Sequence, residues 1–139
     1  MSTARTQGVE TSATWHPLDQ LDIGLGYTYT DAEDLSNNRL LLDRPRNVYT
    51  FTVTERPIPG VSVAWSGSAL NGEEQTDAAS GLDVHEPGYF TSRVAASWQA
   101  RKYLQVFGRI ENVFNNKYDE VSGYPTLDQG FYGGVKFTF

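Results

Sequence analysis

The sequence predicts an all-β fold, an antiparallel transmembrane β-barrel segment of about seven strands. Three observations support this prediction. Apolar and polar residues alternate over several segments, short and long connections alternate between those segments, and the last segment ends on aromatic residues. Alternation with a period of two is the pattern of a strand whose successive side chains point to opposite faces.

Residues 130–139 show this pattern most clearly, because one parity is mainly aromatic or aliphatic and the other is polar or small. A strand of about ten residues spans the hydrocarbon of a bilayer, with its apolar face towards lipid. In water the same strand would leave an exposed apolar edge. The ending also resembles the C-terminal assembly signal of bacterial outer-membrane proteins. The residues that match this signal are Tyr132, Gly134, Phe137 and Phe139.

Six further segments show strand periodicity, and their connections run short, long, short, long, short, long. The predicted strands are 7–16, 21–30, 47–55, 61–70, 89–99 and 104–111, the short connections 17–20, 56–60 and 100–102, and the long ones 31–46, 71–87 and 115–129. Outer-membrane barrels have short periplasmic turns and longer extracellular loops, so we expect the last strand to leave Phe139 on the periplasmic side. Two aromatic girdles are then expected. They comprise Trp15, Trp98 and Phe139 at the periplasmic end and Tyr27, Tyr29, Tyr89 and Phe90 at the outer end.

Composition excludes several classes of protein. The net charge of −6 argues against a nucleic-acid partner, because phosphate binding needs clustered lysine and arginine. The absence of cysteine excludes disulfides and thiol chemistry. No apolar run approaches the roughly eighteen residues of a membrane helix. The mean hydropathy of −0.45 is typical of a soluble protein, but half of every barrel strand is polar as well. A soluble β-sandwich or meander whose apolar faces form a core is therefore the alternative.

The strand count predicts a piece of a larger barrel, because bacterial barrels have an even number of strands, eight or more. Seven strands leave two edges that lipid cannot satisfy with hydrogen bonds. The alternative is that residues 39–42 or the N-terminal arm add an eighth strand and close a small barrel. Residues 1–8 contain no basic and then apolar leader. We therefore expect either that a signal peptide has been removed or that more chain precedes this piece.

The stretch 108–118, GRIENVFNNKY, resembles the R-x-E-N-L-F-x-x-x-Y signature near the C-terminus of TonB-dependent outer-membrane receptors. Residues 8–10, 27–32 and 43–47 match further recurrent pieces of that family in the same order. The run 118–124 before the closing strand is most similar to the cobalamin transporter branch, with catecholate siderophore receptors close behind.

This resemblance implies that residues 1–139 are the last third of a 22-stranded barrel, without the plug domain and the energy-coupling box. It also implies one part of an active transporter in the bacterial outer membrane, energised by TonB, for cobalamin or a ferric siderophore. The implied partners are outer-membrane lipid, the barrel-assembly machinery, the ligand, and the TonB complex through the missing N-terminal part. The alternative function is a small autonomous barrel with a structural or adhesive role.

Few residues are candidates for a site. Arg109 and Glu111 share the inward parity, so we expect a lumenal ion pair, with each other or with a plug. Arg44 and Arg46 flank Pro45 where a long loop re-enters the membrane. They are candidates for contact with a ligand or lipopolysaccharide, although a salt bridge between loops is the favoured interpretation.

The remaining polar residues predict no catalytic or metal site. Asn112, Asn115 and Asn116 are expected to support the strand end and the turn after it, through local hydrogen bonds. His16 and His85 have no serine or carboxylate partner close in sequence, so we expect no enzyme. The acidic loop 71–87 matches no calcium-loop spacing, and we expect it to be solvated, with no metal or other cofactor.

Overall fold

The computed structural model describes residues 3–36, 39–40, 45–76, 80–121 and 124–139. Seven long antiparallel strands form one sheet, in the order β1-β2-β4-β5-β8-β9-β12. They are β1 (Ala4–Leu18), β2 (Leu21–Asp34), β4 (Asn47–Glu55), β5 (Val61–Leu70), β8 (Tyr89–Arg101), β9 (Leu104–Glu111) and β12 (Gly130–Phe137). Neighbours in the sheet are therefore neighbours along the chain, which is the up-and-down order of a meander.

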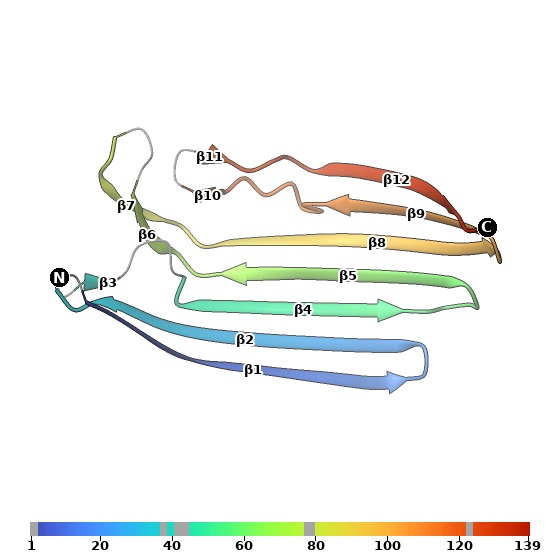
Figure 1. Ribbon diagram of the computed structural model, residues 1–139, viewed down its shortest axis with the longest axis horizontal. Coiled ribbons are helices and arrows are strands. Elements are labelled where there is room, and N and C mark those ends of the chain that lie inside the picture. The colour runs from blue at the N-terminus through green and yellow to red at the C-terminus, as the bar shows by residue number, and fades with distance from the viewer. Residues whose placement is uncertain (1–2, 37–38, 41–44, 77–79, 122–123) are drawn as a thin grey trace.

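The five remaining strands are short, and all lie in the long connections at one end of the sheet (Figure 1). They are β3 (Arg39–Leu40), β6 (Glu73–Thr76), β7 (Asp83–Glu86), β10 (Asp119–Val121) and β11 (Tyr124–Pro125). We call this end the loop end. The tight connections and the C-terminus lie at the opposite end, the turn end. The predicted alternation of short and long connections is confirmed.

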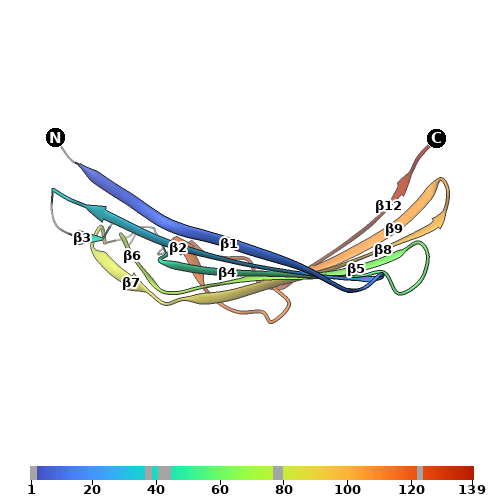
Figure 2. The same ribbon diagram turned by 90° about the horizontal axis from the view of Figure 1, so that it is seen from below.

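The sheet is a single twisted layer, and the described residues form no second layer packed against it (Figure 2). Among the described residues, Ala32 is the only buried apolar one, whereas Trp15, Trp98 and Phe131 are 64%, 53% and 69% exposed. A β-sandwich would bury such side chains between two sheets. The described fold is therefore not the soluble sandwich that the composition left open. Nor does the described part of the chain hold any helix suited to crossing a bilayer.

The register places the apolar residues on one face of the sheet. One rung joins directly opposed residues of all seven strands, namely Trp15, Ile23, Val53, Trp65, Val94, Ile110 and Phe131. The next rung is polar or small, namely Thr14, Gly24, Thr52, Ser66, Arg93, Glu111 and Gly130. We call the face of Ile23 the apolar face and the face of Asp22 the polar face.

Several predicted boundaries are wrong. β1 and β2 pair from Ala4↔Asp34 onwards, so both reach further towards the loop end than 7–16 and 21–30. At the turn end β1 continues through Pro17 to Leu18, with a register shift after Trp15. Proline is tolerated there because Pro17 lies within the register shift, where the regular ladder of hydrogen bonds is interrupted. The longer pairing shortens both the 17–20 turn and the 31–46 loop.

β8 is also longer than predicted and ends at Arg101, with a register shift between Gln99 and Arg101. β12 ends at Phe137 rather than at Phe139. Thr138 lies past the strand and donates its backbone N–H to the carbonyl of Tyr103. Residues 71–87 and 115–129 contain the hairpins β6–β7 and β10–β11 instead of being plain loops.

Arg39 and Leu40 pair only with Asp34 and Glu33 at the far end of β2. They form a short strand at the loop end rather than an eighth spanning strand. Leu41 and Leu42 lie outside the described residues. One predicted girdle residue is also misplaced. Tyr89 opposes Leu70 on the polar face, so it cannot share an outward belt with Tyr27 and Phe90.

Candidate functional site

The polar face is open because its central residues are small. Small hydroxyl side chains from three central strands cover this part of the face, and they do not reach far from the sheet. They are Thr50 and Thr52 of β4, Ser66 and Ser68 of β5, and Thr91 of β8. Together with Arg93 and Glu111 these residues line a shallow hollow of about 310 Å³. Another domain or molecule can therefore pack against this face, on a surface of hydroxyl groups.

A charged group lies beside this floor on β8 and β9. The guanidinium Nε of Arg109 lies 3.1 Å from Oε1 of Glu111, and Nη1 of Arg93 lies 3.9 Å from the same oxygen. Arg109 also lies over the ring of Tyr132 on β12, with 4.7 Å between Cζ and the ring centroid. Arg109 and Glu111 thus lie within ion-pair distance of each other, while their place in a barrel lumen stays a prediction. All three charged side chains remain partly exposed and accessible to a further partner.

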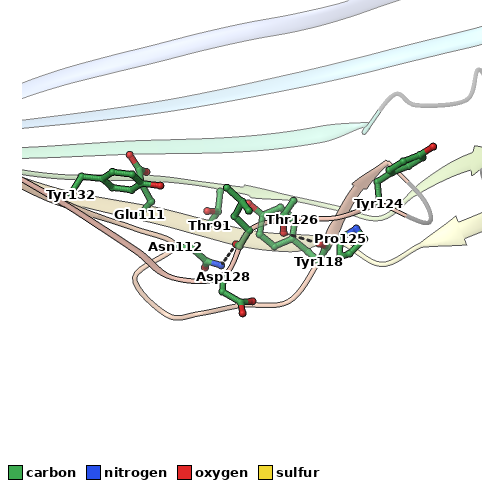
Figure 3. A pocket seen from close by; sticks show the side chains of 10 residues that line it. Thr91, Glu111, Asn112, Tyr118, Tyr124, Pro125, Thr126, Asp128 and Tyr132 are labelled. Carbon is green, nitrogen blue, oxygen red and sulfur yellow. Dashed lines mark hydrogen bonds between the residues drawn. The ribbon is translucent and has the colours of Figure 1, made fainter.

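A pocket of about 480 Å³ adjoins the charged group at the loop end (Figure 3). Its sheet side is formed by Thr91, Glu111 and Tyr132, and its opposite side by the connection from β9 to β12. Tyr118, Tyr124 and Asp128 come from that connection. Its volume lies within the range of pockets that bind small molecules. Its lining offers aromatic rings together with carboxylates, so it can hold a ligand by stacking and by hydrogen bonds.

Asn112 holds this connection in place. It adopts a left-handed φ of 48°, which asparagine tolerates better than most residues, and it is 6% exposed. Its side-chain amide donates to the carbonyl of Asn116 at 2.9 Å and accepts from the N–H of Asn116 at 3.0 Å. Asn116 in turn donates from Nδ2 to the carbonyl of Phe90 at 2.7 Å. The connection is therefore attached to the start of β8.

The far end of the connection is held in a similar way. Asn115 has a φ of 50° and accepts the backbone N–H of Gln129, while Gln129 donates from Nε2 to the carbonyl of Val113. Tyr118 stacks on Tyr89 with ring centroids 4.0 Å apart. The expected role of the asparagines at the strand end thus agrees with these contacts. The sequence did not indicate the attachment to β8 or the Tyr89–Tyr118 stack, because both join segments far apart in the chain.

The two predicted loop arginines have different outcomes. Arg44 lies outside the described residues. Arg46 donates from Nη2 to Oδ1 of Asp31 at 2.9 Å, and this hydrogen bond raises the pKa of Arg46 above its usual value. Arg5 makes an equivalent pair with Glu33 at 2.9 Å. The pair of Arg46 with Asp31 joins the two ends of one predicted connection, 31–46. A salt bridge between loops, like contact with a ligand or lipid, stays a prediction.

One expectation about histidine is wrong. His16 does have a carboxylate partner, because its Nδ1 lies 2.6 Å from Oδ1 of Asp22. Asp22 also accepts from Arg56 at 2.7 Å. The short turn between β1 and β2 brings these side chains together at the turn end. In the part of the chain that the structure describes, no group of three or more histidine, cysteine or acidic residues is placed to hold a metal.

The four residues of the proposed assembly signal lie on and beyond the last strand. Tyr132 and Gly134 are on the polar face of β12, opposite Arg109 and Phe107. Phe137 is on the apolar face opposite Leu104, and Phe139 lies past the strand and is fully exposed. Recognition of these residues during assembly stays a prediction.

The chain belongs to the TonB-dependent receptor-like β-barrel family, whose model matches residues 2–113. It is 26% identical over 122 residues to the ferric-pyoverdine 358 receptor of Pseudomonas putida. That match covers 83% of this chain and 14% of the receptor.

Solved structures share the fold. The ferric-catecholate import receptor Fiu of E. coli K12, in its closed form, superposes with a TM-score of 0.82 at 18% identity over 99% of this chain. The ferripyoverdine receptor of Pseudomonas aeruginosa superposes with a TM-score of 0.81 at 14% identity over 98% of this chain. The chain corresponds to 21% and 20% of those two receptors. It therefore spans about a fifth or less of the length of these relatives.

Proposed function

We propose that this chain is the closing part of an outer-membrane TonB-dependent receptor that imports a ferric siderophore. The observation that carries the proposal is the direction of the two sheet edges. β1 and β12 both run from the loop end to the turn end, because they are the first and the seventh of seven strands that alternate in direction (Figure 1). An antiparallel barrel can close between two such edges only through an odd number of additional strands. The last seven strands of a 22-stranded barrel meet this condition.

The exposure of both faces supports the same proposal. A barrel turns its apolar face to lipid and its polar face to the lumen. The hydroxyl floor of the polar face and the pair of Arg109 with Glu111 suit contact with a plug domain supplied by the rest of the protein. The family's use of TonB would then come through that missing part, and assembly would use Tyr132, Gly134, Phe137 and Phe139.

The choice of ligand rests on the relatives and on the pocket at the loop end. The relatives are named for ferric pyoverdine and ferric catecholates, which favours a siderophore over the cobalamin suggested by residues 118–124. The pocket faces the side from which an external ligand arrives if the loop end is extracellular. Its exposed ring, Tyr124, is 65% accessible and can stack on a ligand.

Two measurements test this function. An antibody against residues 118–139 should detect a product several times larger than 15.5 kDa in outer membranes. A heat-shifted band near 15.5 kDa would instead indicate a small autonomous barrel and overturn the proposal. The intact gene should restore uptake of a labelled ferric siderophore in a deletion strain, and a protonophore should abolish that uptake. Labelled cobalamin in the same strain tests the other ligand.

A pair of variants links uptake to the pocket. Tyr124→Ala removes an exposed ring from the pocket and should weaken siderophore binding. Tyr103→Ala is the matched control, since Tyr103 is 56% exposed but lies at the turn end. Equal losses of siderophore binding in both variants would mean that the pocket has no specific role in binding the ligand.

A further inference from the structure

The pocket at the loop end has two carboxylates and no basic side chain in its lining. Glu111 belongs to its sheet side, and Asp128 belongs to the connection from β9 to β12 (Figure 3). Arg109 pairs with Glu111 and Lys117 pairs with Asp128, but neither basic residue lines the pocket. A ligand inside the pocket therefore contacts the acids and not their basic partners.

The tyrosine rings of the lining also suit a cation, because the face of an aromatic ring attracts positive charge. Arg109 lies over the ring of Tyr132, with 4.7 Å between Cζ and the ring centroid. Tyr124 is 65% accessible, so its ring is open to a cation of the ligand in the same way. One ring of the pocket thus already stacks with a positive group, and a second ring is free to do so.

The long connections at the loop end carry most of the negative charge of the chain. Connection 71–87 contains five acidic residues and no lysine or arginine. Connection 112–129 contains three acidic residues and one lysine, and connection 31–46 contains four acidic residues and three arginines. The rest of the chain has five acidic residues and seven basic ones. A surface of one sign raises the local concentration of ligands of the opposite sign. The loop end therefore favours the approach of a cationic ligand over an anionic one.

We propose that the pocket selects a ferric siderophore with a free ammonium or guanidinium group, and that Glu111, Asp128 and the tyrosine rings bind this group. The inference rests on the proposed function and narrows its ligand. Catecholate donors bring more negative charge than ferric iron neutralises, so a ferric catecholate is an anion that the loop end repels. Hydroxamate donors just neutralise the iron, so an attached ammonium group makes the whole complex a cation. The ligand class is therefore a ferric hydroxamate with a basic side group.

Two ligands that differ only in this charge test the inference. Ferrioxamine B is a ferric hydroxamate with a free ammonium group, and its N-acetylated form lacks that charge. Isothermal titration calorimetry with the full-length receptor in detergent measures both affinities. Ferrioxamine B should bind about three- to tenfold more tightly, and added salt should reduce the difference because it screens the charges. Equal affinity for the two forms, or tighter binding of anionic ferric enterobactin, would overturn the inference.

Two variants that break the same ion pair separate the effect of charge from structural damage. Asp128→Asn removes a negative charge from the pocket lining and should weaken the binding of ferrioxamine B. Lys117→Gln removes the positive partner of that carboxylate and should strengthen it. The N-acetylated form should bind both variants as it binds the wild type. Asp19→Asn at the turn end is the control and should leave both affinities unchanged. A change in the same direction in both pocket variants would mean that the ion pair acts only on structure, and would contradict the inference.

Failure of the proposed function gives a different result. A full-length receptor that neither binds nor takes up any of these three ferric complexes would contradict siderophore import itself. Uptake of ferric enterobactin without uptake of ferrioxamine B would agree with siderophore import and overturn the cationic ligand.

Discussion

The ring of Phe107 lies over Gly134, which stands directly opposite it on the neighbouring strand. A Cβ atom at residue 134 would come within 2.7 Å of Cζ of Phe107, closer than real contacts allow. Glycine therefore gives a large ring on the polar face room to lie flat across β12. This packing role is independent of any role of Gly134 in an assembly signal.

Gly134→Val should force the ring of Phe107 aside and destabilise the receptor by about 1–3 kcal/mol, the usual cost of overpacking. Phe107→Ala combined with Gly134→Val should restore most of that loss. Gly133→Val is the control, because a Cβ there meets only the carbonyl of Phe107 at 3.5 Å. Urea unfolding in detergent measures stability. If the double variant stays as defective as Gly134→Val in assembly, recognition of the glycine rather than packing accounts for the defect.

Asn112→Ala should loosen the connection from β9 to β12, because the side-chain amide that makes two hydrogen bonds to Asn116 is lost. Removing a buried hydrogen-bonding side chain costs about 1–3 kcal/mol. Trypsin cleavage after Lys117 should become faster, and limited proteolysis followed by mass spectrometry measures it. Asn112→Gly retains the freedom to adopt a positive φ but lacks the amide. Wild-type resistance in Asn112→Gly would mean that the positive φ alone, without the side-chain amide, holds the connection.

Arg109 and Glu111 should be weakly coupled. A partly exposed ion pair contributes about 0.2–1 kcal/mol of coupling energy. The stacking of Arg109 on Tyr132 contributes about 0.5–1 kcal/mol, which a separate double-mutant cycle of Arg109 with Tyr132 would measure. A double-mutant cycle of Arg109→Gln with Glu111→Gln should give a coupling energy in the first range. The cycle of Arg93→Gln with Glu111→Gln should give a smaller value, because 3.9 Å rather than 3.1 Å separates the closest atoms. A larger value for Arg93 would contradict the geometry.

Asp22→Asn should loosen the turn end of β1 and β2, because it removes the charge that Arg56 and His16 both contact. Amide hydrogen exchange should become faster in residues 18–23 and remain unchanged at the loop end. Asp19→Asn, a change of the same kind in the adjacent turn, serves as the control. Unchanged exchange in Asp22→Asn would mean that the backbone ladder alone holds this turn.

The sequence predicted the seven spanning strands because the pattern is local. Alternation of Ile23, Leu25 and Tyr27 with Asp22, Gly24 and Gly26 assigns each side chain to a face through the backbone geometry of a strand alone. The three tight connections likewise contain proline, or polar residues between two periodic segments. Strand ends were less certain, since pairing beyond the apolar segment depends on the partner strand, as in the extension of β1 and β2 to Ala4 and Asp34.

The sequence by itself determined the all-β class, the two faces, and the order of short and long connections. It placed Arg109 and Glu111 on one face but left open whether they pair with each other or with a plug. Tertiary structure alone decided the contacts of Phe107 with Gly134, of Asn116 with Phe90, of His16 with Asp22, and the place of Tyr89. The reason is physical. The face to which a side chain points depends on a period of two within one strand. Contacts between strands depend on the register, which the whole hydrogen-bond ladder and its turns set.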